Sequence, residues 1–217
     1  MSIAIATFNL ANYKELADIT DSTKIEYCQR HGYKFFALRN ACYSHRLGFN
    51  KIHYTLDIFK RFPDVEWLLF SECDAMITNL KIRIEDKIDD SFHFIVPIDA
   101  YNINSGNFLA RNTKEGREYL QMIIDSELAY RGQWQGEQQV IIDTYKNYPN
   151  VVKLVEQRYM NSYELELYPE DIKHLQGKDM LGNPAQWEQG DWIVHWAGKS
   201  LQARLQRARE LTKLIVR

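Results

Sequence analysis

The chain has 217 residues, which is enough for one large domain that buries most of its apolar surface. Its formal net charge is −2, and this balance argues against a nucleic-acid partner. The three cysteines, Cys28, Cys42 and Cys73, lack metal-site spacing and are typical of reduced thiols. The first residues show no signal peptide or membrane anchor, so we expect a cytoplasmic location.

Strands and helices alternate through the first 72 residues. Short apolar runs predict strands at 2–8, 33–38 and 65–72. The first helix is expected to stop at Gly32, because glycine adopts the left-handed conformation easily, and the second at Pro63. The inward-facing side chains are predicted to be Ile19, Ile25, Tyr27 and Cys28 in the first helix, and Ile52, Leu56, Phe59 and Phe62 in the second.

The second half of the chain mixes strands, helices and a long irregular region. Asn112 and Glu115 are spaced like a capping box and predict a helix to about Leu128. Further predicted elements are strands at 92–97, 108–111, 151–155 and 192–196, a helix at 137–145, an irregular segment at 157–190, and a C-terminal helix with Leu201, Leu205, Ala208 and Ile215 on one face.

The order of these elements predicts a single α/β domain over residues 1–217. A Rossmann-like, mixed but mostly parallel sheet is expected, with a nucleotide-binding half at about 1–100 and an acceptor-side half at about 101–217. The chain has no GxGxxG after the first strand and no GxxxxGK[ST], so a dehydrogenase or a P-loop enzyme is disfavoured.

Two carboxylates end the apolar run at 65–70. Residues two apart on an extended chain point the same way, so Glu72 and Asp74 are expected to lie side by side. In open α/β sheets, ligands bind outside the carboxyl ends of strands. A divalent cation between the pair and a phosphate ligand would relieve their repulsion, whereas a solvated strand end is the alternative interpretation.

A second candidate lies at the end of the late strand. His195 could complement the two carboxylates around a Mn²⁺-like ion, or it could be a core histidine bonded to a backbone carbonyl. Gly198 permits close backbone approach to a ligand, and Lys199 suits a phosphate.

Three weaker patterns could contribute to the same site. The stretch 102–108 offers amide and hydroxyl groups for sugar hydroxyls, but it is also typical of a polar turn. Glu137 and Gln138 could face a reacting sugar or simply open a helix. Lys51 could reach a phosphate, although a solvated surface lysine is the more common case.

The C-terminal helix is rich in basic residues. Its basic face could contact an anionic membrane, but a solvated basic face is favoured. The residues concerned are Lys199, Arg204, Arg207, Arg209, Lys213 and Arg217.

Taken in order, seven segments resemble a known family, that of the fungal and plant Golgi α-galactosyl-, mannan- and xyloglucan α-xylosyltransferases, which has the GT-A fold. The segment SECDAMITN falls on the family's DxD motif, and GDWIVHWAG resembles its His-x-x-Gly signature. The other matching segments are 27–33, 50–67, NSGNFLAR at 104–111, 137–138 and 157–163.

This resemblance implies a retaining glycosyltransferase that moves a hexose or pentose from a UDP-linked donor to a glycan acceptor, with Mn²⁺ or Mg²⁺. It implies that Asp74 and His195 bind the metal. Glu72, which stands where the family has Asp, would bind the ion directly, bind it through water, or contact the ribose. Glu137 and Gln138 would be the catalytic candidates. The implied donor-binding residues are Thr7, Asn9, Tyr13, Lys51, Glu72, Asn104, Ser105, Gly106, Gly198 and Lys199.

The family's membrane anchor and stem have no counterpart in this sequence, so we expect a bacterial or viral enzyme, or a catalytic fragment. Two other functions remain open. A sugar-1-phosphate nucleotidyltransferase shares the sheet topology, but its glycine-rich signature is absent after the first strand. A non-catalytic carbohydrate- or nucleotide-binding module is the other alternative, because Glu72 departs from the motif.

Overall fold

The computed structural model describes residues 1–40, 42–170 and 176–217. Its helices are α1 (Lys14–His31), α2 (Phe49–Arg61), α3 (Lys114–Asp125), α4 (Glu137–Thr144) and α6 (Leu201–Leu211). Its strands are β1 (Ile3–Asn9), β2 (Lys34–Arg39), β3 (Trp67–Ser71), β4 (Ala75–Ile77), β5 (Phe94–Pro97), β6 (Asn107–Arg111), β7 (Val152–Val155) and β8 (Ile193–His195). The strands and helices expected from the sequence are therefore present.

Most of the strands join in one six-stranded sheet with the order β2-β1-β3-β6-β5-β7. The pairs β1/β2, β1/β3 and β5/β7 are parallel, while β6 runs antiparallel to both of its neighbours. This confirms the predicted α/β fold with a mixed, mostly parallel sheet. A second, two-stranded sheet pairs β4 with β8 in antiparallel register.

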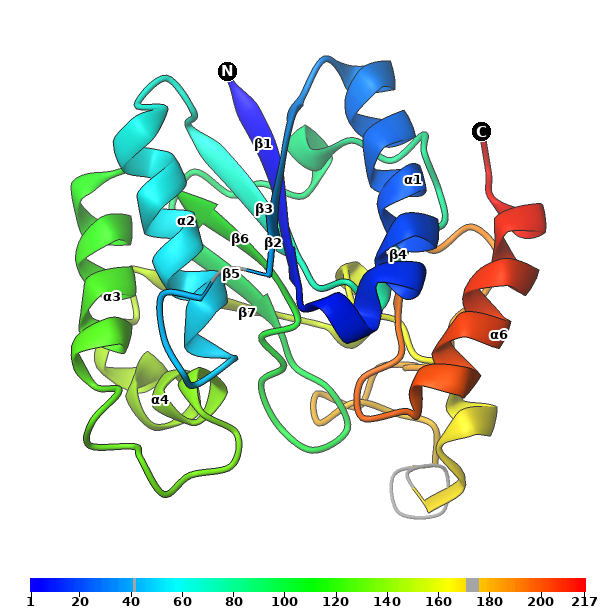
Figure 1. Cartoon of the computed structure of the whole chain (residues 1–217). Coiled ribbons are helices and arrows are strands. Elements are labelled where there is room, and N and C mark those ends of the chain that lie inside the picture. The colour runs from blue at the N-terminus through cyan, green and yellow to red at the C-terminus, as the bar shows by residue number, and fades with distance from the viewer. Residues whose placement is uncertain (41, 171–175) are drawn as a thin grey trace.

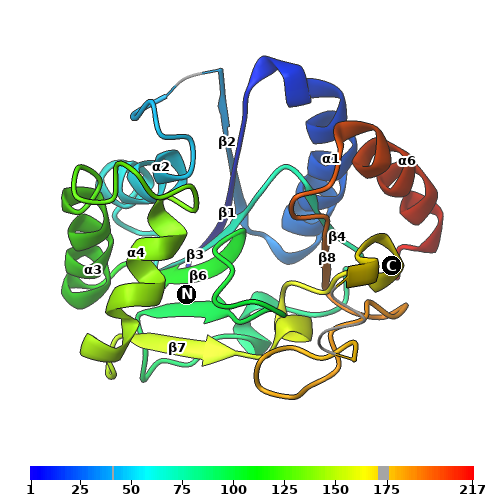
Figure 2. The ribbon, with the colours of Figure 1, turned by 90° about the horizontal axis from the view of Figure 1, so that it is seen from below.

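Helices cover both faces of the large sheet (Figure 1). Helices α2, α3 and α4 lie on one side, and α1, α6 and the small sheet lie on the other (Figure 2). Alternate side chains on a strand point to opposite faces of the sheet. A central strand therefore contributes to the two apolar cores, one on each face of the large sheet. In β1 and β3, Ala4, Ala6, Leu68 and Phe70 pack under α2 and α3, whereas Ile3, Ile5, Trp67 and Leu69 pack toward α1 and β4.

The N-terminal cap of α3 differs from the expected capping box. The side chain of Thr113, not Asn112, accepts a hydrogen bond from the backbone N–H of Gly116. Asn112 instead donates its amide to the carbonyl of Val65 and so ties the loop to the start of β3. The helix also ends at Asp125, short of the predicted Leu128.

Two assignments were wrong: Ile25 does not face inward, and Ile215 does not belong to the C-terminal helix, although it packs partly buried against the core. Ile25 of α1 is 40% exposed, because the neighbouring Lys24 occupies the buried position and donates to the carbonyl of Glu72. Ile215 lies beyond the end of α6 at Leu211, where the chain turns so that Val216 pairs with Asn79. Of the predicted irregular region 157–190, residues 171–175 lie outside the described part; short 3₁₀ turns occur at Gln157–Tyr159 and Leu165–Leu167.

Several basic residues of the C-terminal segment are paired within the chain. Arg204 pairs with Asp74, Arg207 with Glu164, and Arg209 with Glu15. The expectation of a solvated basic face therefore fails for Arg204 and Arg207, and nothing here supports contact with a membrane. None of the described helices is long and apolar enough to cross a bilayer.

Candidate active site

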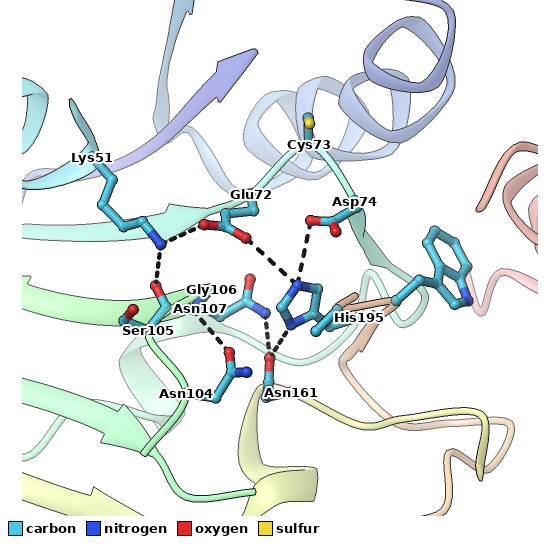
Figure 3. A network of polar contacts seen from close by, with 12 residues as sticks. Lys51, Glu72, Cys73, Asp74, Asn104, Ser105, Gly106, Asn107, Asn161 and His195 are labelled. Carbon is cyan, nitrogen blue, oxygen red and sulfur yellow. Dashed lines mark hydrogen bonds and ion pairs between the residues drawn. The ribbon is translucent and has the colours of Figure 1, made fainter. Parts of the chain in front are cut away.

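The two carboxylates lie on a turn between two strands. Strand β3 ends at Ser71 and β4 begins at Ala75, whose N–H donates to the carbonyl of Glu72 at 3.0 Å. The segment is therefore not the extended chain that was expected. The turn still directs Glu72 and Asp74 toward the same point, while Cys73 between them points away (Figure 3).

The small sheet brings the late histidine to this turn. Antiparallel pairing sets His195 of β8 opposite Ala75 of β4, so the imidazole lies next to Asp74. Its Nε2 is 3.3 Å from Oδ1 of Asp74 and 3.7 Å from Oε2 of Glu72. One ligand atom from each of the three residues lies within 4.8 Å of the others, which is close enough to share an ion.

The orientation of the imidazole is fixed by Asn161. Nδ1 of His195 lies 2.7 Å from Oδ1 of Asn161, and the same oxygen accepts a hydrogen bond from the amide of Asn107. An amide oxygen accepts only, so Nδ1 is the donor. Nε2 is then the atom that can hold a proton or a metal ion. It is buried, and within the described part of the chain it faces the carboxylates of Asp74 and Glu72 without a hydrogen bond of good geometry.

Charge coupling within this cluster shifts all three pKa values. Burial lowers the pKa of His195, but the charge of Asp74 and then that of Glu72 outweigh it and raise the pKa to about 9. Burial opposes ionisation of the carboxyls as well. Even so, Lys51 holds the pKa of Glu72 below its usual value, and His195 does the same for Asp74. Both carboxyls therefore stay ionised, as ligands of a cation must be.

Lys51 is buried rather than solvated. Its ammonium forms an ion pair with Glu72, lies 2.9 Å from Oε1 of Glu137, and donates to the carbonyl of Ser105 at 3.1 Å. These carboxylates raise its pKa despite the burial. Gln138 accepts from the N–H of Ser105 at 3.1 Å. The start of α4 and the 104–106 segment therefore meet at Lys51.

Residue 106 has to be glycine because the ring of His195 lies against its backbone. A Cβ at Gly106 would lie 2.2 Å from Cε1 of His195, far inside van der Waals contact. Its N–H donates to Oδ1 of Asn104, whose amide donates in turn to Asp99. The 104–106 segment thus supports the imidazole as well as facing the cavity.

A cavity of about 870 Å³ lies above this cluster. Gly198, whose φ of 70° suits glycine, lines it on the side of the small sheet. The predicted site residues that line it are Lys51, Glu72, Asp74, Asn104, Gly106, Glu137, Gln138, His195 and Gly198, and Ser105 is bonded to three of them.

Besides Ser105, four predicted donor-binding residues are not among those that line the cavity. Thr7 and Asn9 are buried in β1, and Tyr13 follows it. The amine of Lys199 donates to the carbonyl of Leu167 at 2.6 Å and lies 3.7 Å from the ring centre of Tyr168. Their donor-binding roles stay predictions.

Four residues of the site were missed by sequence reasoning. Asp99 accepts from Tyr163 and Asn104, and burial raises its pKa. It follows the carboxyl end of β5, so the rule that singled out Glu72 could have found it. Asn161, Arg204 and the exposed Trp134 carry no local signal of a role.

Comparison with known proteins places this arrangement in a family. The model of the galactosyl transferase GMA12/MNN10 family matches residues 3–91 and 88–205, which is most of the chain. The chain belongs to this family. An α-1,2-galactosyltransferase of Schizosaccharomyces pombe is 24% identical over 212 residues, which cover 80% of this chain and 53% of the relative. The chain thus spans about half the length of the curated relatives that it matches.

Solved structures with the same fold are glycosyltransferases. One is the crystal structure of a glycosyltransferase involved in glycosylation of the major capsid of PBCV-1, with a TM-score of 0.75, 20% identity, and coverage of 97% of this chain and 100% of that one. Another is the galactosyltransferase LgtC in complex with donor and acceptor sugar analogs, with a TM-score of 0.58, 12% identity, and coverage of 99% and 96%. The predicted GT-A fold and the family resemblance are confirmed.

Proposed function

We propose that this protein is a metal-dependent glycosyltransferase that moves a hexose or pentose from a UDP-linked donor to a hydroxyl group of a glycan, with retention of anomeric configuration. The observation that carries the proposal is the cluster of Glu72, Asp74 and His195 at the cavity, with the Lys51 ammonium beside it. Membership of the family and the fold shared with LgtC support the reaction class.

The residues fit a divalent cation. Two ionised carboxylates form a mixed oxygen and nitrogen donor set with a buried imidazole nitrogen that makes no hydrogen bond to any described residue. Such a set suits Mn²⁺ better than Mg²⁺, which prefers oxygen ligands and water. Asp74, His195 and Glu72 would hold the ion, which when bound neutralises charge on the departing diphosphate.

The chain's own groups would position the donor sugar. Ser105, Glu137 and Gln138 form a connected hydrogen-bond network, so their polar atoms are fixed before a donor arrives. Fixed dipoles at a reacting centre stabilise a developing charge without reorganisation. Lys51 lies at the edge of this network, where two carboxylates fix the position of its ammonium at the cavity.

If the configuration is retained, the side chains near the sugar bear on which of two mechanisms operates: a covalent intermediate on a side chain, or attack by the acceptor on the face from which the diphosphate departs. Glu137 is buried and engaged by Lys51 and Ser105, and Gln138 is an amide and a weak nucleophile. These features favour attack by the acceptor on the face from which the diphosphate departs. The acceptor hydroxyl must then be held close to the anomeric carbon.

Two exposed aromatic rings at the cavity suit a glycan acceptor. Trp134 is 91% exposed and Tyr101 is 62% exposed, and both line the cavity. Aromatic side chains offer a flat apolar face together with a polar tip, which suits contact with a ligand at the mouth of a cavity. A pyranose can stack its C–H face on such a ring while Asn102 and Gln135 face its hydroxyls.

A transfer assay tests the proposal. The protein is incubated with a panel of UDP- and GDP-sugars and Mn²⁺, and both nucleoside diphosphate release and glycoside formation are followed. We expect turnover with a UDP-sugar, and a loss of about 10²–10³ in rate in Asp74→Asn, by analogy with loss of one charge-stabilising contact. Asp74→Ala should abolish transfer in a folded protein. Unchanged turnover in either variant would remove the metal role.

The same assay separates the two alternatives. A non-catalytic binding module would bind a nucleotide sugar but release no diphosphate with any donor. A sugar-1-phosphate nucleotidyltransferase would instead release pyrophosphate when it is given a nucleoside triphosphate and a sugar phosphate.

A further inference from the structure

Arg204 lies at the cavity because of how α6 begins. Gly198 turns the chain after β8, and Ser200 caps the helix by accepting from the N–H of Ala203. This places Arg204 in the first turn, where a cation opposes the helix dipole. A positive charge in that position therefore depends on a specific partner nearby.

That partner is the candidate metal ligand Asp74. The Arg204 Nη2 lies 2.8 Å from Oδ2 of Asp74, on the oxygen that His195 does not face. Nε donates to the carbonyl of Trp196 at 3.1 Å, and the guanidinium lies 5.7 Å from the ring centre of Tyr13. The side chain is only 11% exposed, so these contacts hold it in one place.

The guanidinium is held on one side and lines the cavity on the other. Among the residues that the structure describes, none accepts a hydrogen bond from Nη1 of Arg204. Lys199, the cation that the sequence favoured for phosphate, is bonded to Leu167 and stacked on Tyr168 instead. Arg204, not Lys199, lines the cavity.

The ion pairs around the candidate metal site indicate how the Arg204 guanidinium could bind a diphosphate. Lys51 is shared between Glu72 and Glu137, so its charge is already balanced by protein carboxylates. Asp74 is balanced by His195 and Arg204. A divalent cation bound to Asp74 would neutralise that carboxylate in place of Arg204. The Arg204 guanidinium could then pair with a diphosphate, which a planar guanidinium binds through two N–H groups.

We propose that Arg204, rather than Lys199, is the α6-side cation that binds the donor diphosphate, and that in the metal-free protein it keeps Asp74 in place. This inference rests on the proposed function. It also predicts opposite effects on two ligands. Removing the charge of Arg204 weakens diphosphate binding, but it removes a positive charge that competes with the metal for Asp74.

Calorimetry with Mn²⁺ alone, and with UDP at saturating Mn²⁺, tests this. Arg204→Gln removes the charge but keeps amide donors for Asp74 and Trp196. We expect UDP affinity to fall about 10- to 100-fold, as for loss of a hydrogen bond to a charged group. Mn²⁺ affinity should stay the same or rise. Arg204→Lys should recover part of the UDP affinity, and Lys199→Ala should lose less than about threefold.

Arg209→Ala is the matched control, because it removes the same charge from an exposed position on the same helix. It should leave both affinities unchanged. The inference is overturned if Arg204→Gln binds UDP as tightly as the unsubstituted protein, if Lys199→Ala loses as much, or if the affinities for Mn²⁺ and UDP fall together, as a purely structural role would require. If the unsubstituted protein with Mn²⁺ binds neither UDP nor GDP, the proposed function fails and this inference with it.

Discussion

His195 is positioned by Asn161, which lies on the side of the imidazole ring away from the proposed metal site. Asn161 accepts from Nδ1 and thereby directs Nε2 toward Glu72 and Asp74. Loss of such an outer partner typically costs 10- to 100-fold in metal affinity. We therefore predict that Asn161→Ala lowers Mn²⁺ affinity by about 10- to 100-fold in a calorimetric titration.

The matched variant for this prediction is Asn161→Asp, which keeps an acceptor oxygen for Nδ1 and should lose much less affinity. Unchanged Mn²⁺ binding in Asn161→Ala would show that the imidazole needs no support from this side, or that His195 is not a ligand.

Gly106 lies against the imidazole with no room for a side chain. In Gly106→Ala the new methyl group would meet Cε1 of His195, and overpacking of this kind typically costs about 1–3 kcal/mol. We predict that loss in the free energy of unfolding, measured with denaturant, together with weaker Mn²⁺ binding. Gly132→Ala, where a Cβ meets nothing within 4 Å, is the control and should change stability by less than about 0.5 kcal/mol. Equal stability of the two variants would contradict the close packing.

Among single residues, Asp74 and His195 could be predicted because both follow apolar strand segments, where a polar side chain has to face an edge of the sheet. Arg204 and Asn161 could not. Their partners lie far away in the sequence, and on their own segments they resemble an ordinary helix cation and an ordinary loop amide.

Helix α1 holds the turn that carries the two carboxylates. The Thr20 hydroxyl donates to the carbonyl of Cys73 at 2.8 Å, and the buried Lys24 ammonium donates to that of Glu72 at 2.9 Å. We predict that Thr20→Val, which keeps the shape but removes the donor, lowers the free energy of unfolding by about 1–3 kcal/mol and weakens Mn²⁺ binding.

Ser22→Ala on the same helix is the comparison, because that hydroxyl is exposed and bonds only within α1. It should lie within about 0.5 kcal/mol of the unsubstituted protein by denaturant unfolding. If Thr20→Val were equally neutral in both measurements, α1 would not be the support of this turn.

At the level of elements, apolar runs located the strands correctly, but the helix cap of α3 and the turn after β3 were predicted incorrectly. The cap of α3 fell on Thr113 because both 112 and 113 are good capping residues, and the tertiary contact of Asn112 with Val65 decided between them. The segment 72–74 was expected to be extended because it directly follows an apolar strand segment. A backbone bond and the supports from α1 close it instead.

Across the whole molecule, cation binding should stabilise the fold, because the site exists only when β3, β4 and β8 are assembled. At a free Mn²⁺ concentration of 100 times Kd the gain is about 2.7 kcal/mol. For a chain of this size that corresponds to a rise in Tm of roughly 5–10 °C.

We expect this rise in a thermal melt with Mn²⁺, a smaller one with Mg²⁺, and none with Mn²⁺ plus EDTA. Asp74→Asn is the control that should respond weakly to any of the ions. An equal response of Asp74→Asn and the unsubstituted protein would place the ion elsewhere.

The strand order of the sheet could be predicted only in part from the sequence. Alternating strands and helices indicate parallel pairing in the first half, and β1, β2 and β3 follow it. The insertion of β6 beside β3, antiparallel to it, depends on which edge the later strand reaches, and no local pattern encodes that. Residue chemistry suggested His195 as a partner of the two carboxylates, and the family resemblance implied the same metal site, but neither indicated that β4 and β8 pair.

We propose that Glu72, Asp74 and His195 share one divalent cation that faces a nucleoside diphosphate. The most direct measurement is an anomalous difference map at the manganese absorption edge, from crystals grown with Mn²⁺ and UDP. We expect one strong peak bonded to Asp74 and His195, with the diphosphate beside it. A peak elsewhere, or UDP bound with no peak at this cluster, would show that these residues do not hold the ion.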